Sequence, residues 1–186
     1  MTLSSMIKFF CESLDTISVD LIEKVSYEIV SAINKNESVF VCGNGGSGAN
    51  ANLFSTIISD NIKKNNLGSR IQSLNSNMST MTSLAESAGY DKVFSFQLEK
   101  RARASDILVV ISGSGNSRNI IEAILTAKKI GMYTIGLTGM GGGRLSSVAD
   151  LSIIVSSDIM EDIESIHTII IHAISEYVVA ELDCVK

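Results

Sequence analysis

The amino-acid sequence predicts an α/β fold, a three-layer sandwich with a five-stranded parallel sheet between two layers of helices. Short runs of aliphatic and β-branched residues alternate along the chain with helical stretches long enough for the crossovers that parallel strands need. These runs are apolar without a regular polar position, as expected of strands that are covered on both faces. We expect the strands at residues 39–41, 71–74, 107–111, 133–137 and 151–155, of which 71–74 has the weakest pattern.

Helices are expected before and after this sheet. Apolar residues recur at three- and four-residue steps over 7–33, which predicts a long amphipathic helix or a helix pair. All 186 residues fit one domain, with N-terminal helices over 1–36 and an α/β core over 37–186. The core ends in a helix, 160–182, that is apolar on nearly every side and must be buried on nearly every side. We therefore expect it to pack against another copy of the chain in a homo-oligomer.

The composition is that of a packed globular protein, with 45% hydrophobic and 19% charged residues. The net charge is −5 and no run of Lys or Arg stands out, so nucleic acid and anionic membrane surfaces are poor partners. Three scattered cysteines, without CxxC or zinc-ligand spacing, favour a reduced cytoplasmic location. The N-terminal residues do not have the pattern of a signal peptide, and no apolar run has the length of a membrane span.

Two loops rich in glycine and serine follow predicted strands and open helices. They are Cys-Gly-Asn-Gly-Gly-Ser at 42–47 and Ser-Gly-Ser-Gly-Asn-Ser at 112–117. Loops at the carboxyl ends of parallel strands converge, and helix N-termini offer unpaired N–H groups to an anion. Ser112, Ser114 and Ser117 add hydroxyl donors, so the second loop is the better phosphate candidate. Each loop alone is also consistent with a plain tight turn before an N-cap.

Other glycine motifs do not fit these loops. Neither loop has the GK[ST] of a Walker A motif or the GxGxxG of a dinucleotide site with its distal acid. A third glycine cluster, 139–144, has few hydroxyls, so we interpret it as a close turn beside the site. Its Arg144 is interpreted as a solvated side chain.

These motifs, taken in order, resemble the sugar isomerase (SIS) domain family, and within it the bacterial phosphoheptose isomerases. The resemblance rests on the two loops, on 88–95, on Leu-Thr-Gly…Gly-Gly at 137–143 and on the terminal helix from 162 to 172. It implies a flavodoxin-like domain in a homotetramer, with active sites between subunits. The implied reaction converts sedoheptulose 7-phosphate to a glycero-manno-heptose 7-phosphate, toward lipopolysaccharide or capsule heptose.

The loops and the resemblance together give a set of expected site residues. Aldose–ketose isomerisation needs a base at one carbon and an acid at the neighbouring oxygen. His172 falls on the family's catalytic histidine, and Glu164 is the second candidate, about 12 Å away along a straight helix. A silent, packed histidine is the alternative interpretation of His172. The expected substrate contacts are Asn44, Gly45, Gly46, Ser47, Ser87, Ser112, Gly113, Ser114, Asn116, Ser117 and Glu164.

The chain departs from the family at several of its functional positions. The family's HFxxE motif, whose His and Glu bind zinc or move protons, is replaced here by Leu53 and Ile57. Because aliphatic side chains cannot ligate a metal, we expect no metal and no other cofactor. The family's Asn-Asp pair is Glu86-Ser87, its Arg is Phe96 and its terminal-helix Gln is Glu164. A carboxylate at 164 would replace the one lost at 57.

Two functions therefore remain open from the sequence. The first is a sugar-phosphate isomerase, acting on a heptose or on another sugar of a surface-polysaccharide pathway. The second is a non-catalytic sugar-phosphate- or protein-binding member of the family, of the type that associates with a replication initiator. Retention of His172 favours the enzyme, whereas the loss of the His and Glu at positions 53 and 57 favours the binding protein.

Overall fold

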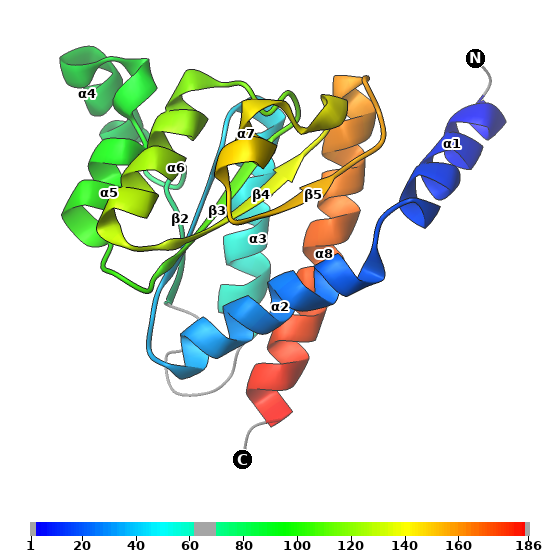
Figure 1. Cartoon of the computed structure of the whole chain (residues 1–186), viewed down its shortest axis with the longest axis horizontal. Coiled ribbons are helices and arrows are strands. Elements are labelled where there is room, and N and C mark those ends of the chain that lie inside the picture. Colours follow the sequence, from blue (N-terminus) through cyan, green and yellow to red (C-terminus); the bar gives the residue numbers. More distant parts are fainter. Residues whose placement is uncertain (1–2, 62–69, 185–186) are drawn as a thin grey trace.

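The computed structural model describes residues 3–61 and 70–184, which form a five-stranded, all-parallel sheet with helices on both faces (Figure 1). This confirms the predicted fold class. In chain order the elements are α1 (Leu3–Asp15), α2 (Val19–Asn34), β1 (Val39–Gly43), α3 (Gly45–Asn61), β2 (Ile71–Ser73), α4 (Met78–Ala88), η2 (Tyr90–Lys92), α5 (Ser95–Arg101), β3 (Ile107–Ser112), α6 (Arg118–Ile130), β4 (Tyr133–Thr138), η3 (Met140–Gly142), α7 (Gly143–Val148), β5 (Leu151–Ile154) and α8 (Met160–Cys184).

The strand order β2-β1-β3-β4-β5 puts the first and third strands side by side. The chain leaves β1 toward one edge of the sheet and later leaves β3 toward the other, so the order of the strands reverses between them. Gly43 at the end of β1 pairs with Ile111 near the end of β3. The two loops after these strands therefore start at the same level, at the switch point where α/β sheets bind ligands.

The two faces of the sheet carry separate apolar cores. Alternate residues of a strand point to opposite faces. Val39 and Val41 pack with α2, α3 and α8, whereas Phe40 and Cys42 pack with α5 and α6. The two helical layers are visible on either side of the sheet in Figure 1. Because both faces are covered, the strands need no polar alternate position, which explains their uniformly apolar sequence.

The N-terminal periodicity belongs to a helix pair. Ser18 caps α2, and its hydroxyl accepts a hydrogen bond from the Leu21 amide at 3.4 Å. The apolar spacing continues across this cap, so spacing alone did not locate the break. Helix α2 packs across the core against α8, while α1 projects beyond it and chiefly touches α8 (Figure 1).

Helix α8 is buried on one side within a single chain. Ile163, Ile166 and Ile170 are at most 1% exposed, but Ile169 is 44% and Tyr177 is 43% exposed. In the described ranges, α8 alone is long and apolar enough by length and composition to cross a membrane. Packing of its buried side against the sheet and α3 accounts for much of that apolar composition. Its outer side leaves large apolar side chains uncovered.

His167 joins the buried side of α8 to the sheet. Its side chain is fully buried, and Nε2 donates a hydrogen bond to the carbonyl oxygen of Thr138, at the end of β4, at 3.2 Å. Within the described part of the chain, Nδ1 has no hydrogen-bond partner. Burial lowers the pKa of His167 to about 4 from its ordinary 6.5. The imidazole is therefore neutral in the folded protein at neutral pH.

This burial predicts an acid sensitivity of the fold. Between pH 6.5 and 4 the unfolded chain binds a proton at His167 and the folded chain does not. The stability that the neutral His167 gives the fold is thus fully present above pH 6.5. As the pH falls toward 4, the free energy of unfolding decreases by about 3 kcal/mol. Urea unfolding at a series of pH values measures it. His167→Gln keeps a hydrogen-bond donor but does not titrate. Its free energy of unfolding should therefore decrease by about 3 kcal/mol less over this pH range than that of the wild-type protein. Equal losses in both proteins would contradict the assignment.

Candidate functional site

The first loop turns sharply from β1 into α3. Gly45 has a φ of 53°, in the left-handed region that favours glycine. A side chain at Gly43 would meet the backbone oxygen of Ser47 at 2.4 Å, so the turn folds closely onto the first turn of α3. The Asn75 amide holds Gly43 from the side of β2, with hydrogen bonds of 3.1 and 2.8 Å to its N–H and C=O. The N-terminus of α3 therefore lies directly beyond the carboxyl end of β1.

The second loop repeats this arrangement between β3 and α6. Gly115 has a φ of 63° and allows the turn. Ser117 occupies the N-cap position of α6, but its side chain makes no capping hydrogen bond. Its hydroxyl is therefore available to a ligand at the positive end of the helix.

The structure brings the two loops together around one cavity. Its volume is about 210 Å³. Its walls are three residues of the first loop, four of the second, one residue of β3 and two of α8. They are Asn44, Gly45, Ser47, Ser112, Gly113, Ser114, Ser117, Ile111, Met160 and Glu164. We call this space the loop cavity. Most of the substrate contacts expected from the sequence lie in its lining.

Glu164 forms the third wall of the loop cavity. A side chain at Gly46 would lie 2.1 Å from Glu164 Oε2, so the carboxylate sits directly over this glycine at the start of α3. The positive end of the α3 dipole favours a carboxylate at this place. Asn50 of α3 donates to the Glu164 carbonyl oxygen at 3.0 Å, and Thr168 donates to the same oxygen at 2.9 Å. The hydrogen bond from Asn50 ties α8 to α3 at Glu164.

Three expected substrate contacts lie outside the lining of the loop cavity: Gly46, over which the Glu164 carboxylate sits, Ser87 and Asn116. Ser87 is exposed on α4, where its hydroxyl donates to the Ser83 carbonyl at 2.8 Å. The Asn116 amide donates to the Ser114 carbonyl at 2.9 Å and accepts from the Arg144 N–H at 3.0 Å. Asn116 therefore connects the second loop to the glycine cluster that follows β4. Its role in this structure is to shape the loop.

The structure does not place His172 in the loop cavity. His172 is exposed and lines a separate space of about 480 Å³ with Ile57, Asn61, Glu176 and residues of the α8 C-terminal half. Two turns of helix separate it from Glu164, so one chain alone does not gather the two candidate proton carriers around one ligand. Ile57, at the position of the family's glutamate, lies beside His172 in this space.

The residues near His172 do not fit the zinc site of the family. Leu53 and Ile57 stand at two of its positions and supply no donor atom. Across residues 3–61 and 70–184, no group of three or more His, Cys, Asp or Glu side chains is arranged to hold a metal ion.

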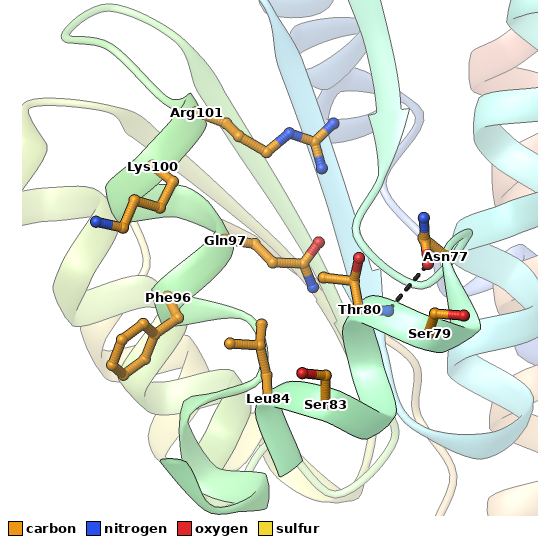
Figure 2. Close-up of a pocket in the computed structure, with 9 residues that line it drawn as sticks. All are labelled: Asn77, Ser79, Thr80, Ser83, Leu84, Phe96, Gln97, Lys100 and Arg101. Carbon is orange, nitrogen blue, oxygen red and sulfur yellow. Dashed lines mark hydrogen bonds between the residues drawn. The ribbon is translucent and has the colours of Figure 1, made fainter. Parts of the chain in front are cut away.

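A larger space of about 610 Å³ lies between α4 and α5, away from both loops (Figure 2). One wall carries the α4 side chains Ser79, Thr80 and Ser83, and the other includes Lys100 and Arg101 of α5. No acidic side chain and no histidine lines it. It therefore offers no carboxylate or imidazole among the described residues, whereas the loop cavity has the Glu164 carboxylate and is the better candidate site.

The sequence analysis missed Asn119, on the first turn of α6. Its side chain is 2% exposed and exchanges hydrogen bonds with the side chain of Asn44. The signal available was a polar residue two positions after Ser117, in a helix whose next residues are apolar. A polar residue in a first turn is ordinarily solvated, so this signal is weak.

Comparison with known proteins identifies the family of the chain. The SIS domain model matches residues 6–139. The chain is 34% identical to the phosphoheptose isomerase of Aliarcobacter butzleri over 185 residues, covering 96% of this chain and 98% of that protein. It is 37% identical to the phosphoheptose isomerase of Campylobacter concisus over 150 residues, covering 81% and 79%.

Solved structures of phosphoheptose isomerases share the fold. The structure of a phosphoheptose isomerase from Neisseria gonorrhoeae superposes with a TM-score of 0.85 at 29% identity, covering 98% of this chain and 95% of that one. The chain therefore belongs to the SIS domain family and, within it, to the group of the phosphoheptose isomerases.

Proposed function

We propose that this chain is a sugar-phosphate isomerase that interconverts sedoheptulose 7-phosphate and a glycero-manno-heptose 7-phosphate, a step toward bacterial surface heptose. The observation that carries the proposal is the meeting of two glycine- and serine-rich loops with Glu164 around one cavity. Relatives of nearly full length that bear the name phosphoheptose isomerase support it.

The second loop binds the phosphate in this proposal. Ser112, Ser114 and Ser117 lie in the lining, and a hydrogen bond to a charged group contributes roughly 1.5–3 kcal/mol. The N-termini of α3 and α6 add partial positive charge without a lysine. The cavity of about 210 Å³ is smaller than typical pockets for whole ligands, so the phosphate end enters it between the serines and the sugar extends out of it past Glu164.

Glu164 and His172 carry the proton transfers. The Glu164 carboxylate lies in the loop cavity, takes the proton from the carbon beside the sugar carbonyl and returns it to the former carbonyl carbon. His172 exchanges a proton with the neighbouring oxygen, as histidine does in general acid–base catalysis. Because His172 faces a separate, open space on its own chain, we propose that the two groups meet a sugar at a boundary between copies.

The reaction proceeds in this proposal without a metal or other cofactor. Leu53 and Ile57 remove two donors of the family's zinc site, and Glu164 supplies a carboxylate where the family has an amide.

We expect purified protein to convert sedoheptulose 7-phosphate, followed by NMR, at a rate that neither zinc nor a chelator changes. Glu164→Gln and His172→Asn should each lower kcat by about 10²–10⁴-fold, the usual contribution of a placed proton carrier. Glu176→Gln, which removes a carboxylate next to His172 and outside the loop cavity, is the matched control and should keep kcat within a few-fold.

The other outcomes of this assay are equally informative. Full activity of Glu164→Gln would contradict its catalytic role. Saturable binding of the sugar phosphate without turnover by the wild-type protein would favour the non-catalytic alternative, which the loss of the His and Glu at positions 53 and 57 already supports.

We further propose that the chain forms a homotetramer in the cytoplasm. Ile7 on α1 is 56% exposed, and Ile169 and Tyr177 leave an apolar surface on the outer side of α8. Cys11 and Cys42 are both free, which is consistent with a reducing compartment.

Light scattering on a sizing column tests the assembly. The wild-type protein should elute with the mass of four chains. Ile169→Asp places a charge on the uncovered side of α8 and should reduce this mass, whereas Ile169→Val keeps the surface apolar and should preserve it. A wild-type protein with the mass of one chain would contradict the proposal.

A further inference from the structure

A closed pair of amides connects the two loops directly above the sheet. Asn44 Nδ2 donates to Asn119 Oδ1, and Asn119 Nδ2 donates to Asn44 Oδ1, both at 2.8 Å. The hydroxyl of Tyr90 also donates to Asn44 Oδ1, at 2.9 Å, and the Ile120 N–H donates to Asn119 Oδ1, at 3.0 Å. Each amide oxygen therefore accepts two hydrogen bonds, which is its full capacity.

The Asn44–Asn119 pair lies beyond the last paired residues of β1 and β3. Strands β1 and β3 pair as far as Gly43 and Ile111. Beyond that point Asn44 is the single residue between β1 and α3, and Asn119 is the second residue of α6. The amide pair thus ties the N-terminus of α3 to the N-terminus of α6, across the opening between two helix ends that both face the loop cavity.

This connection has a consequence for ligand binding. Ser47 lies on one wall of the loop cavity, and Ser112 and Ser117 lie on the other. Hydrogen bonds weaken steeply with distance and angle, so donors on both walls serve one phosphate only if the walls keep a fixed separation. Asn44 Oδ1 already accepts two hydrogen bonds, so it cannot accept a further one from a sugar hydroxyl. Toward a ligand this residue has one remaining amide hydrogen.

We propose that Asn119 is a positioning residue of the phosphate site, acting through Asn44 to hold the two loops at the separation that a phosphate needs. The inference rests on the proposed function, in which the loop cavity binds the phosphate end of the substrate. Asn119 is distinguished from a solvated helix residue by its burial and by the two hydrogen bonds that its side-chain oxygen accepts. Tyr90 holds the outer side of the same pair.

The test is a double-mutant cycle read as phosphate affinity. Titration calorimetry with inorganic phosphate, and then with sedoheptulose 7-phosphate, gives Kd for the wild-type protein, Asn119→Ala, Asn44→Ala and the double variant. We expect Asn119→Ala to raise Kd about tenfold or more, the scale of one lost charge-assisted contact. In the Asn44→Ala background, Asn119→Ala should raise Kd by less than twofold, because the Asn44 side chain through which Asn119 acts is already absent.

Asn77→Ala is the matched control. Asn77 caps α4 outside the loop cavity, where its side chain accepts from the Thr80 N–H at 2.9 Å. Loss of this asparagine also removes a side-chain hydrogen bond to the protein, but it should leave Kd unchanged. A merely structural role for Asn119 predicts equal effects in both Asn44 backgrounds, and this result would overturn the proposal.

The binding data also separate this inference from the proposed function. If the wild-type protein binds neither inorganic phosphate nor the sugar phosphate, the proposed function fails and the positioning role fails with it. If the wild-type protein binds both and Asn119→Ala binds them equally well, only the positioning role is wrong. Circular dichroism of each variant shows that the chain remains folded during the measurement.

Discussion

The site depends on one topological constraint, the adjacency of β1 and β3 in a sheet whose strand order reverses between them. Their crossovers run in opposite directions, so the loops that follow them open at the same level with no helix lying between them. Gly43 opposite Ile111 sets that level. Two helix N-termini then converge on one small space, and their partial positive charge attracts an anion although the chain is acidic overall.

Helix α8 completes the space and determines its chemistry. Its first turns place Met160 and Glu164 over the two loops, where Gly113 and Gly46 leave room for them. His167 anchors the same stretch of helix to the end of β4. The position of the Glu164 carboxylate therefore follows from the packing of a core helix, and a rigid element of this kind holds a side chain more precisely than a loop does.

The sequence predicted the fold and the place of the two glycine- and serine-rich loops because both arise from local patterns. Apolar runs such as 107–111 and the glycines at 43, 45 and 115 specify strands and turns within a few residues. Other features depend on contacts across the chain. Ser87 and Asn116 make hydrogen bonds to Ser83, Ser114 and Arg144, and both lie outside the lining of the loop cavity. The partnership of Asn44 and Asn119 spans 75 positions, and no local pattern indicates it.

The open side of α8 shows the same limit for His172. Helical spacing placed it on the same helix as Glu164, but the face on which it lies is uncovered in one chain. Large apolar side chains such as Ile169 and Tyr177 are exposed on the same helix. What covers such side chains depends on complementary shape and charge, and the spacing of residues along one chain does not encode these.

A crystal structure of the protein soaked with sedoheptulose 7-phosphate tests the central claim most directly. The account predicts phosphate density in the loop cavity, within hydrogen-bonding distance of the hydroxyls of Ser112, Ser114 and Ser117, with the sugar extending toward Glu164. Phosphate density in the space between α4 and α5, or an empty loop cavity at saturating ligand, would contradict it.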